Sequence, residues 1–213
     1  MTALAVVVAF FLGALPWAYI LSRVVAGVDI RTVGDGNVGA RNTFNEVGHR
    51  TGIAVGLLDF GKGAAAIVLA RQLGLDDMWV LVAGMAVIAG HDWTPFLRFQ
   101  GGQGFAATGG VLFALMPAET MAAIAVASLV LAVSRHWSFS NAVGFAFLPV
   151  VAWWTGQPFR MMVFLAAMLC VVGIKKLVDL PRARPNASRL EDIVPLAPDD
   201  SIASQAELRT PGP

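Results

Sequence analysis

The stretch GIAVGLLDFGKGAAAIVLA, residues 52–70, is apolar along its length except for Asp59 and Lys62. A helix needs about 20 mostly apolar residues to cross a bilayer, so this stretch predicts a membrane span. Six further segments of the chain have the same character. The chain is therefore predicted to be an all-α membrane protein with about seven transmembrane helices. The segments cover residues 3–22, 52–70, 78–91, 104–116, 118–134, 139–155 and 159–177.

The composition supports a membrane protein and excludes several classes of function. Of the 213 residues, 57% are hydrophobic and 14% are charged, and the mean hydropathy is +0.69. A net charge of +1 provides no basic field, so no nucleic-acid partner is predicted. Cys170 is the single cysteine, which excludes a disulfide framework. The three histidines lack the spacing of metal ligands, so no metal site is predicted.

The chain divides into two parts near residue 180. Residues 1–180 are predicted to form one polytopic membrane domain. Its first apolar run is too long for a signal-peptide core and lacks a basic start, so we expect a retained helix. Within the domain, Pro117 predicts a break between the fourth and fifth spans, because proline cannot continue the hydrogen-bond ladder. The tail, residues 181–213, is rich in Pro, Asp and Ser and is expected outside the bilayer, with its last part disordered.

Basic residues are distributed unequally between the two sides of the predicted spans. Twelve of the 15 Lys and Arg residues fall on one side, Arg71 and Arg160 fall on the other, and Lys62 lies within a span. An excess of basic residues marks the cytoplasmic side of a membrane protein. The N-terminus is therefore predicted outside the cell and the C-terminus in the cytoplasm.

Two polar, glycine-rich segments interrupt the apolar pattern, and the predicted topology places both on the cytoplasmic face. The first is GDGNVGARN, residues 34–42, and the second is GHDWTPFLRFQGGQG, residues 90–104. Glycine lets a backbone approach a ligand closely, and N–H groups in a turn or at a helix N-terminus attract anions. The two segments therefore predict phosphate-binding nests. The glycines concerned are Gly34, Gly36, Gly39, Gly101, Gly102 and Gly104.

Several polar residues allow both a structural and a functional interpretation. Asp59 and Lys62 share one helical face, where they form either a self-neutralising ion pair or a site at which Lys62 binds an anion. His91 is either a structural hydrogen-bonding residue or a proton relay. Arg135 and Ser138 are either a basic flank and a helix N-cap or part of the anion site.

The two loops, in this order, resemble those of the bacterial acyl-phosphate:glycerol-3-phosphate acyltransferase family of seven-span membrane enzymes. That family carries a GSGNPGATN-like first motif, DxxKG in the second span, a GHxxPxFLxFxGGKG second motif and an HRENIxRL-like third motif. This chain has GDGNVGARN at 34–42, DFGKG at 59–63, GHDWTPFLRFQGGQG at 90–104 and ARPNASRL at 183–190. The resemblance covers nearly the whole chain in order and spacing.

The resemblance implies transfer of an acyl group from acyl phosphate to the first hydroxyl of glycerol 3-phosphate, which gives lysophosphatidic acid for phospholipid biosynthesis. It implies a multi-pass protein of the bacterial inner membrane, with the active site on the cytoplasmic face and no metal or organic cofactor. The implied partners are glycerol 3-phosphate, acyl phosphate and membrane lipids. The implied catalytic residues are His91, Asn42 and Asn186. The implied substrate-binding residues are Gly34, Gly36, Asn37, Gly39, Arg41, Lys62, Gly101, Gly102, Gly104, Arg135, Ser138 and Arg189.

The chain differs from the family pattern at five motif positions. Asp35 replaces Ser, Arg41 replaces Thr, Gln103 replaces Lys, Ala183 replaces His and Pro185 replaces Glu. One cation is lost from the second loop while one is gained in the first, so we hypothesise that Arg41 contacts phosphate in place of the missing lysine. Three alternatives stay open: a related enzyme with a different acceptor, a non-catalytic protein that binds lipid phosphate, and a small transporter.

Overall fold

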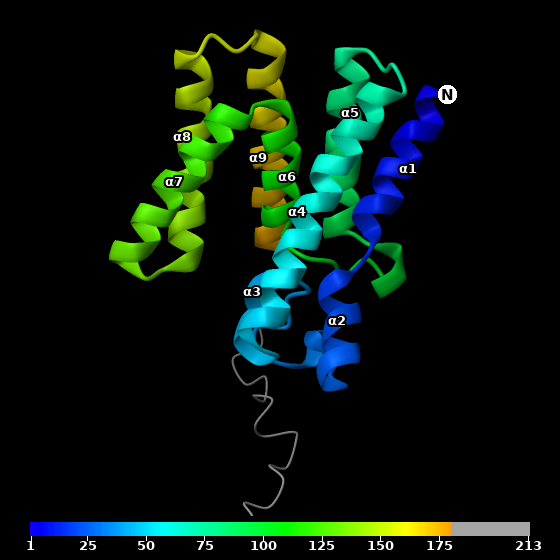
Figure 1. Ribbon diagram of the computed structural model, residues 1–213, viewed down its shortest axis with the longest axis vertical. Coiled ribbons are helices and arrows are strands. Elements are labelled where there is room, and N and C mark those ends of the chain that lie inside the picture. Colours follow the sequence, from blue (N-terminus) through cyan, green and yellow to red (C-terminus); the bar gives the residue numbers. More distant parts are fainter. Residues whose placement is uncertain (180–213) are drawn as a thin grey trace, which may run out of the picture.

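A computed structural model of the protein describes residues 1–179, which are helical and contain no strands (Figure 1). Two short 3-10 turns, η1 (Ile30–Thr32) and η2 (Pro95–Leu97), lie in the two glycine-rich segments or beside them. The longer elements are α1 (Thr2–Ala14), α2 (Trp17–Ala26), α3 (Ala40–Glu46), α4 (His49–Gln72), α5 (Asp77–Asp92), α6 (Phe105–Leu115), α7 (Pro117–Ser134), α8 (Trp137–Trp154) and α9 (Phe159–Asp179).

The prediction of an all-α membrane protein is confirmed. Within residues 1–179, five helical segments are long and apolar enough to cross a membrane: Thr2–Ala26, His49–Gln72, Asp77–Leu97, Pro117–Ser134 and Phe159–Asp179. The shorter apolar helix α6 has 11 residues, fewer than the roughly 20 that span a bilayer unaided. The number seven therefore stays a prediction, although each of the seven predicted segments coincides with helical structure.

The first predicted span is not one continuous helix. The chain leaves the helical conformation at Leu15, where ψ is 114°, and α2 begins at Trp17. Pro16 accounts for the break, because proline has no N–H to donate and disfavours a helical residue before it. At the break, the carbonyl of Leu15 accepts hydrogen bonds from the N–H of Trp17 at 3.1 Å and from Lys62 Nζ at 2.9 Å. A charged residue of α4 thereby fixes the bend between α1 and α2.

Two helix pairs pack with their backbones in contact. Along the α4–α6 seam, a methyl group added at Gly63 would overlap the backbone of Ala107, and one added at Gly110 would overlap the backbone of Phe60. The pair α1 and α5 meets in the same way through glycines of both helices. Small residues permit this close approach. Because no hydrophobic driving force brings helices together within lipid, membrane helices associate through such close van der Waals packing. These four helices form the tightly packed half of the molecule.

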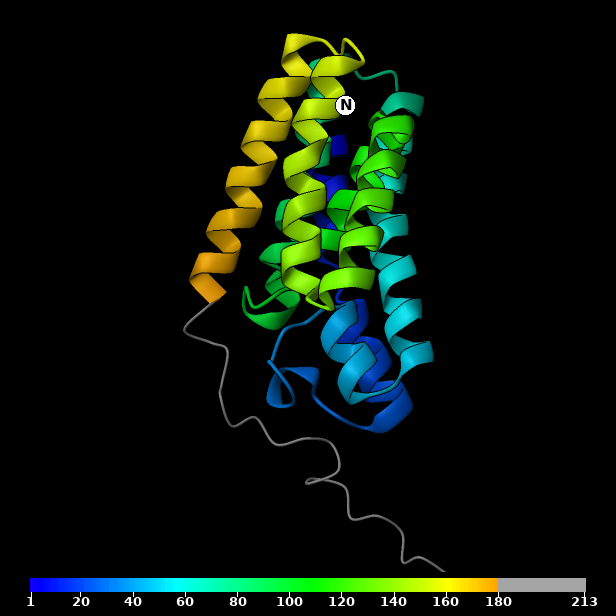
Figure 2. The same ribbon diagram turned by 90° about the vertical axis from the view of Figure 1, so that its left-hand side faces the viewer.

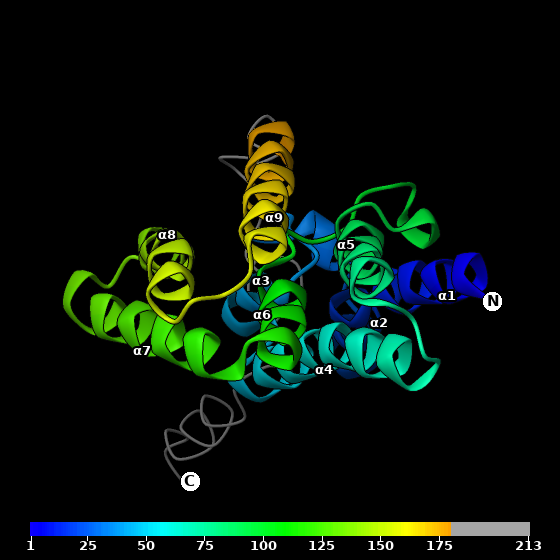
Figure 3. The same cartoon turned by 90° about the horizontal axis from the view of Figure 1, so that it is seen from above.

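The α7–α8 hairpin stands apart from that half. Only Met116 separates the last residue of α6 from the first residue of α7, so the two helices must meet there. Away from this joint, α7 and α8 lean away from α4 and α6, as Figures 1 and 3 show. The hairpin and the tight half therefore enclose a wedge that is closed at the α6–α7 joint and open at the other end.

Both glycine-rich segments, α2 and α3 gather at the open end of the wedge (Figures 1 and 2). The two segments touch, since a methyl group on Gly102 would lie 2.8 Å from the carbonyl oxygen of Val38. Segments about 60 residues apart in the sequence thus meet at one end of the bundle.

Candidate functional site

The side chain of Asn42 organises the first glycine-rich segment. Asn42 extends from α3, is buried, and accepts a hydrogen bond at Oδ1 from the N–H of Asp35 at 3.2 Å. Its amide nitrogen lies 3.1 Å from each of three backbone carbonyl oxygens, those of Ile30, Val33 and Asn37. Because these contacts occupy both polar atoms of the amide, and Asn42 does not line the cavity described below, the geometry gives it a role in positioning the loop. Its predicted catalytic role stays a prediction.

Two glycines allow the chain to turn around Asn42. Gly34 and Gly36 have φ values of 57° and 71°, in the left-handed region that favours glycine. At Gly34 a Cβ atom would also overlap the Asn42 amide. The N–H of Gly36 donates to the carbonyl of Val33 at 3.0 Å, so it is not free for an anion. These two glycines therefore shape the loop.

The second glycine-rich segment folds back onto the end of α5. The N–H of Gly101 donates to the carbonyl of Asp92 at 3.2 Å, and the N–H of Gly102 donates to the carbonyl of His91 at 3.1 Å. A methyl group on Gly102 would overlap the His91 ring. The free N–H nest expected at these two glycines is therefore already paired within the chain. The N–H groups without an intrahelical acceptor lie one step later, in the first turn of α6.

A buried polar cluster joins α4 and α5 behind the two loops. Asp59 Oδ1 lies 2.9 Å from Lys62 Nζ and 3.5 Å from His91 Nδ1, and all three side chains are buried. Asp59 and His91 line the cavity, whereas Lys62 does not. The ammonium group of Lys62 is shared between the Asp59 carboxylate and the Leu15 carbonyl. This geometry supports the ion-pair interpretation, and direct phosphate binding by Lys62 stays a prediction.

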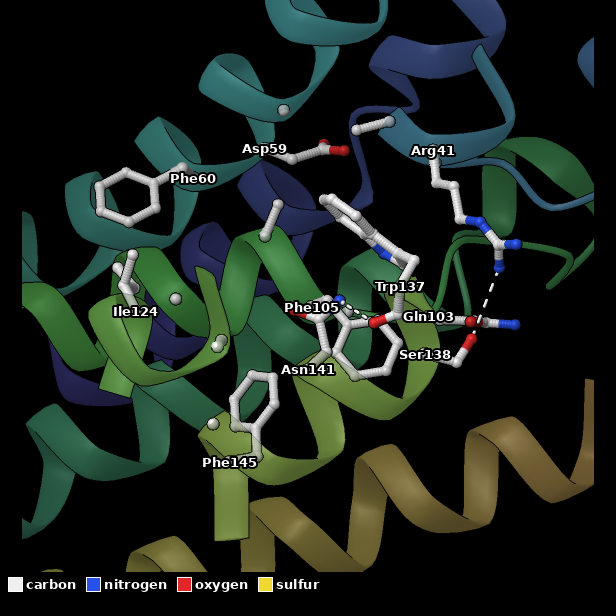
Figure 4. A pocket seen from close by; sticks show the side chains of 18 of the residues that line it. Arg41, Asp59, Phe60, Gln103, Phe105, Ile124, Trp137, Ser138, Asn141 and Phe145 are labelled. Carbon is white, nitrogen blue, oxygen red and sulfur yellow. Dashed lines mark hydrogen bonds between the residues drawn. The ribbon is translucent and has the colours of Figure 1, made fainter. Parts of the chain in front are cut away.

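A cavity of about 300 Å³ fills the wedge between the tight half and the hairpin. Its polar residues gather at the open end, where loop, α3 and α8 side chains converge (Figure 4). They include Asp35, Asn37, Arg41, Asp59, His91, Gln103, Ser138 and Asn141. The rest of the lining is apolar or small and reaches Leu112, Thr120 and Leu148 near the α6–α7 joint. The cavity is therefore amphiphilic, with a polar mouth and an apolar interior.

Arg41 and Ser138 meet across the mouth of the cavity. Arg41 lies in the first turn of α3 and Ser138 in the first turn of α8, and Nη1 of the arginine lies 3.5 Å from Oγ of the serine (Figure 4). The structure thus brings together two predicted site residues that are 97 positions apart. Gln103 lies at the same mouth.

A second hollow adjoins the cavity at this contact. It measures about 870 Å³ and shares Arg41, Trp137 and Ser138 with the first cavity. Arg135 lines this second hollow and not the first cavity. The predicted site residue Arg135 therefore does not line the cavity that His91 and Gln103 line.

The mouth also contains residues that the sequence did not single out as site residues. Asp59 contacts His91, which lies on a different helix, and its i, i+3 spacing from Lys62 indicated only an ion pair. Asn141 lies one helical turn after Ser138 on the same face of α8, so that spacing was a usable signal. The predicted residues Asn186 and Arg189, with the third motif, lie outside the described residues.

Comparison with known proteins identifies the family. A family model described as glycerol-3-phosphate acyltransferase matches residues 3–186. The chain is 38% identical over 189 residues to glycerol-3-phosphate acyltransferase 2 of Moorella thermoacetica, an alignment that covers 88% of this chain and 92% of the relative. It is 33% identical over 182 residues to glycerol-3-phosphate acyltransferase 1 of Dehalococcoides mccartyi, covering 83% and 88% of the two chains.

Solved structures of similar shape agree with this result. The glycerol 3-phosphate form of PlsY (YgiH), an integral membrane glycerol 3-phosphate acyltransferase, superposes with a TM-score of 0.78 at 26% identity, covering 85% of this chain and 90% of that one. The lysophosphatidic acid form superposes with a TM-score of 0.76 at 24% identity and supports the fold. The chain therefore belongs to the glycerol-3-phosphate acyltransferase family.

Proposed function

With membership of this family as the premise, we propose that the chain transfers an acyl group from acyl phosphate to the first hydroxyl of glycerol 3-phosphate and releases lysophosphatidic acid. The observation that carries the proposal is the amphiphilic cavity, whose polar mouth continues into an apolar interior. An acyl phosphate has the same two parts, a charged phosphate and an apolar chain. A small, wholly polar substrate alone would leave the apolar interior without a use.

The proposed reaction needs no covalent intermediate with the protein. The hydroxyl oxygen attacks the acyl carbonyl carbon, the carbon–oxygen bond to phosphate breaks, and inorganic phosphate leaves with the electron pair of that bond. Because acyl phosphate is a mixed anhydride, it is already activated, and the proposal calls for no metal or organic cofactor. The protein has to hold two phosphates, stabilise charge on the carbonyl oxygen and accept the hydroxyl proton.

Residues at the mouth can supply these roles. The guanidinium of Arg41 is a permanent cation that can bind phosphate through two parallel hydrogen bonds. The first turn of α6 borders the cavity at Gly104, Phe105 and Ala106, and its N–H groups favour an anion. His91 is the proposed proton acceptor, and the nearby Asp59 carboxylate orients its ring.

The substitutions in the motifs fit a rearranged phosphate site. Gln103 stands where the family has a lysine, and Arg41 lies at the same mouth of the cavity. An arginine in this place can provide the positive charge that Gln103 lacks. The Asp35 carboxylate accepts a hydrogen bond from the N–H of Asn37 at 3.0 Å, and this local turn contact partly satisfies it.

We propose that the enzyme spans the bacterial inner membrane with the mouth of the cavity on the cytoplasmic side. The support is the bias of basic residues toward that side and the clustering of both loops at one end of the bundle. A fluorescent protein that matures only in the cytoplasm, fused after Leu180, is expected to give signal. Alkaline phosphatase at the same position is expected to be inactive, and the opposite pattern contradicts the proposed orientation.

The deciding experiment is an acyl-transfer assay on the full chain in lipid nanodiscs. Glycerol 3-phosphate is supplied as acceptor, and palmitoyl phosphate and palmitoyl-CoA are offered as rival donors. We expect lysophosphatidic acid from palmitoyl phosphate alone. Transfer from the thioester alone refutes the donor, and transfer only to another polyol phosphate refutes the acceptor. No transfer, combined with saturable binding of lysophosphatidic acid, favours the non-catalytic lipid-phosphate-binding protein.

A further inference from the structure

The cavity of about 300 Å³ between the tight half and the hairpin ends near the joint between α6 and α7. Glu119, in the first turn of α7, accepts hydrogen bonds at Oε1 from Thr155 Oγ1 and Gln157 Nε2, each at 2.7 Å. These bonds tie the start of α7 to the turn between α8 and α9. With α6 and α7 joined through Met116, the closed end of the wedge is fixed by covalent and hydrogen-bonded connections.

Three side chains from three helices close the cavity at this end. Leu112 of α6, Thr120 of α7 and Leu148 of α8 line it and are only 1%, 2% and 2% exposed. The Thr120 hydroxyl donates to the carbonyl of Met116 at 2.8 Å, so it requires no further polar partner. The closed end is thus an apolar surface that suits the terminal methyl group of a chain.

The walls between the mouth and the closed end combine small residues with the aromatic side chains of Phe60, Phe105 and Phe145. Ala106 and Gly109 of α6 face Ala123, Ala127 and Gly144 of the hairpin across the cavity. Small side chains leave room for a chain lying between the helices. Leu148 follows Ser138, at the mouth, by ten positions along α8, which is about 15 Å of helix at a rise of 1.5 Å per residue.

Resting on the acyl transfer proposed above, we propose that Leu112, Thr120 and Leu148 form a stop that sets the longest acyl chain the enzyme accepts efficiently. The reacting carbonyl must lie at the polar mouth, so a chain of fixed length reaches a fixed depth in the wedge. A chain longer than that depth has to fold or leave the cavity, and its outer methylenes lose their burial. The stop determines specificity and takes no part in the chemistry.

The test measures kcat/KM for lauroyl, myristoyl, palmitoyl and stearoyl phosphates with the full chain in nanodiscs. Leu148→Ala deepens the cavity and is expected to raise the ratio of stearoyl to myristoyl transfer about tenfold. Ala123→Leu narrows the cavity and is expected to shift the preference toward lauroyl phosphate. Ile124→Phe is a second narrowing variant. Ile124 lines the cavity but is partly exposed, so this position can accept a larger side chain without unfolding the protein.

Val150→Ala is the matched control. Val150 lies on the same helix as Leu148, but it is exposed and does not line the cavity. Its chain-length profile is expected to coincide with that of the wild type. The proposed stop is overturned if Leu148→Ala and a folded narrowing variant both show the chain-length profile of the wild type. That result would leave the proposed acyl transfer intact.

A binding measurement separates failure of the stop from failure of the proposed function. Lysophosphatidic acids of graded chain length are added to wild type and variants, and the shift in melting temperature is recorded. If no variant transfers any acyl group, the proposed enzyme activity fails, and the stop is judged on binding alone. A longer optimum chain for Leu148→Ala than for wild type supports the stop, and an identical optimum overturns it.

Discussion

The tight half of the molecule and the α7–α8 hairpin solve different problems. In the tight half, helix backbones touch at glycines, and the buried cluster of Asp59, Lys62 and His91 has fixed partners. The hairpin packs mainly on itself and is anchored at the closed end of the wedge. Groups that need an exact geometry thus belong to the closely packed part. The wall that we propose contacts the acyl chain belongs in part to the hairpin.

The largest effect is expected from breaking the α4–α6 seam. Gly63→Val places a branched side chain against the backbone of Ala107, which cannot yield without separating the helices. We expect more than about 4 kcal/mol of destabilisation and loss of most folded protein in size-exclusion chromatography. The matched control is Gly61→Ala on the same helix, where, apart from the helix's own nearby backbone, the described residues place no atom within 4 Å of an added methyl group. A melting temperature for Gly63→Val equal to that of the control contradicts the seam.

The next largest effect concerns the polar cluster within the tight half. Lys62→Met leaves the Asp59 carboxylate buried without its cation and removes one of the two donors to the Leu15 carbonyl, the other being the N–H of Trp17. Removing one partner of a buried ion pair costs about 3–5 kcal/mol, so a large fall in melting temperature is expected. The double variant with Asp59→Asn is expected to recover part of the loss. Unchanged stability with abolished turnover indicates instead that Lys62 binds phosphate.

A change at Arg41 tests the contact that joins the two halves across the mouth. Arg41→Thr removes the proposed phosphate-binding cation from the cavity that Asp35 also lines, and it is expected to lower kcat/KM by about 100-fold or more, with little change in melting temperature. Ser138→Ala removes only the hydroxyl partner and is expected to have a smaller effect. The rates are measured with palmitoyl phosphate and glycerol 3-phosphate.

Two comparisons make the Arg41 experiment specific. Arg50→Thr removes an exposed cation that does not line the cavity and is expected to leave kcat/KM unchanged. Adding Gln103→Lys to Arg41→Thr is expected to restore part of the activity, and more with Asp35→Ser, because residues sharing a site act non-additively. Activity that appears only in this triple variant shows that the natural chain is not an active enzyme.

The smallest effect on stability is expected from a change in the segment that follows α2. The hydrogen bond from Arg31 to Asp29, at 2.7 Å, lowers the pKa of the Asp29 carboxyl below its ordinary value. The pair therefore stabilises the fold fully above the unfolded pKa of about 3.9 and loses this contribution as the pH falls through the folded pKa. Asp29→Asn is expected to cost up to about 1 kcal/mol near neutral pH. In thermal melts, the difference in melting temperature between Asp29→Asn and wild type is expected to be smaller in acid than at neutral pH. An equal difference in acid and at neutral pH refutes the stabilising role of the Asp29–Arg31 pair.

Some elements could be read from the sequence because their signals are local. The segments predicted at 52–70 and 118–134 differ from α4 and α7 by at most three residues at either end, since apolar runs and Pro117 mark their limits. The break at Pro16 was missed, although the same proline rule applies there, because the surrounding run is apolar enough to read as one span. The helix α3 was missed because it is short and because its N-cap, Gly39, has no side chain that could mark the helix start by capping it.

The sequence by itself determined that this chain is an all-α membrane protein, which family it resembles, and which polar residues interrupt its apolar helices. These properties follow from hydropathy and from residue order, and both are written along the chain. The tertiary structure alone decided that Asp59 contacts His91, that Arg41 reaches Ser138, and that the N–H groups of Gly101 and Gly102 are paired with carbonyls of α5. Such contacts depend on how helices distant in sequence pack against one another, and the glycine seams and the α6–α7 joint set that packing.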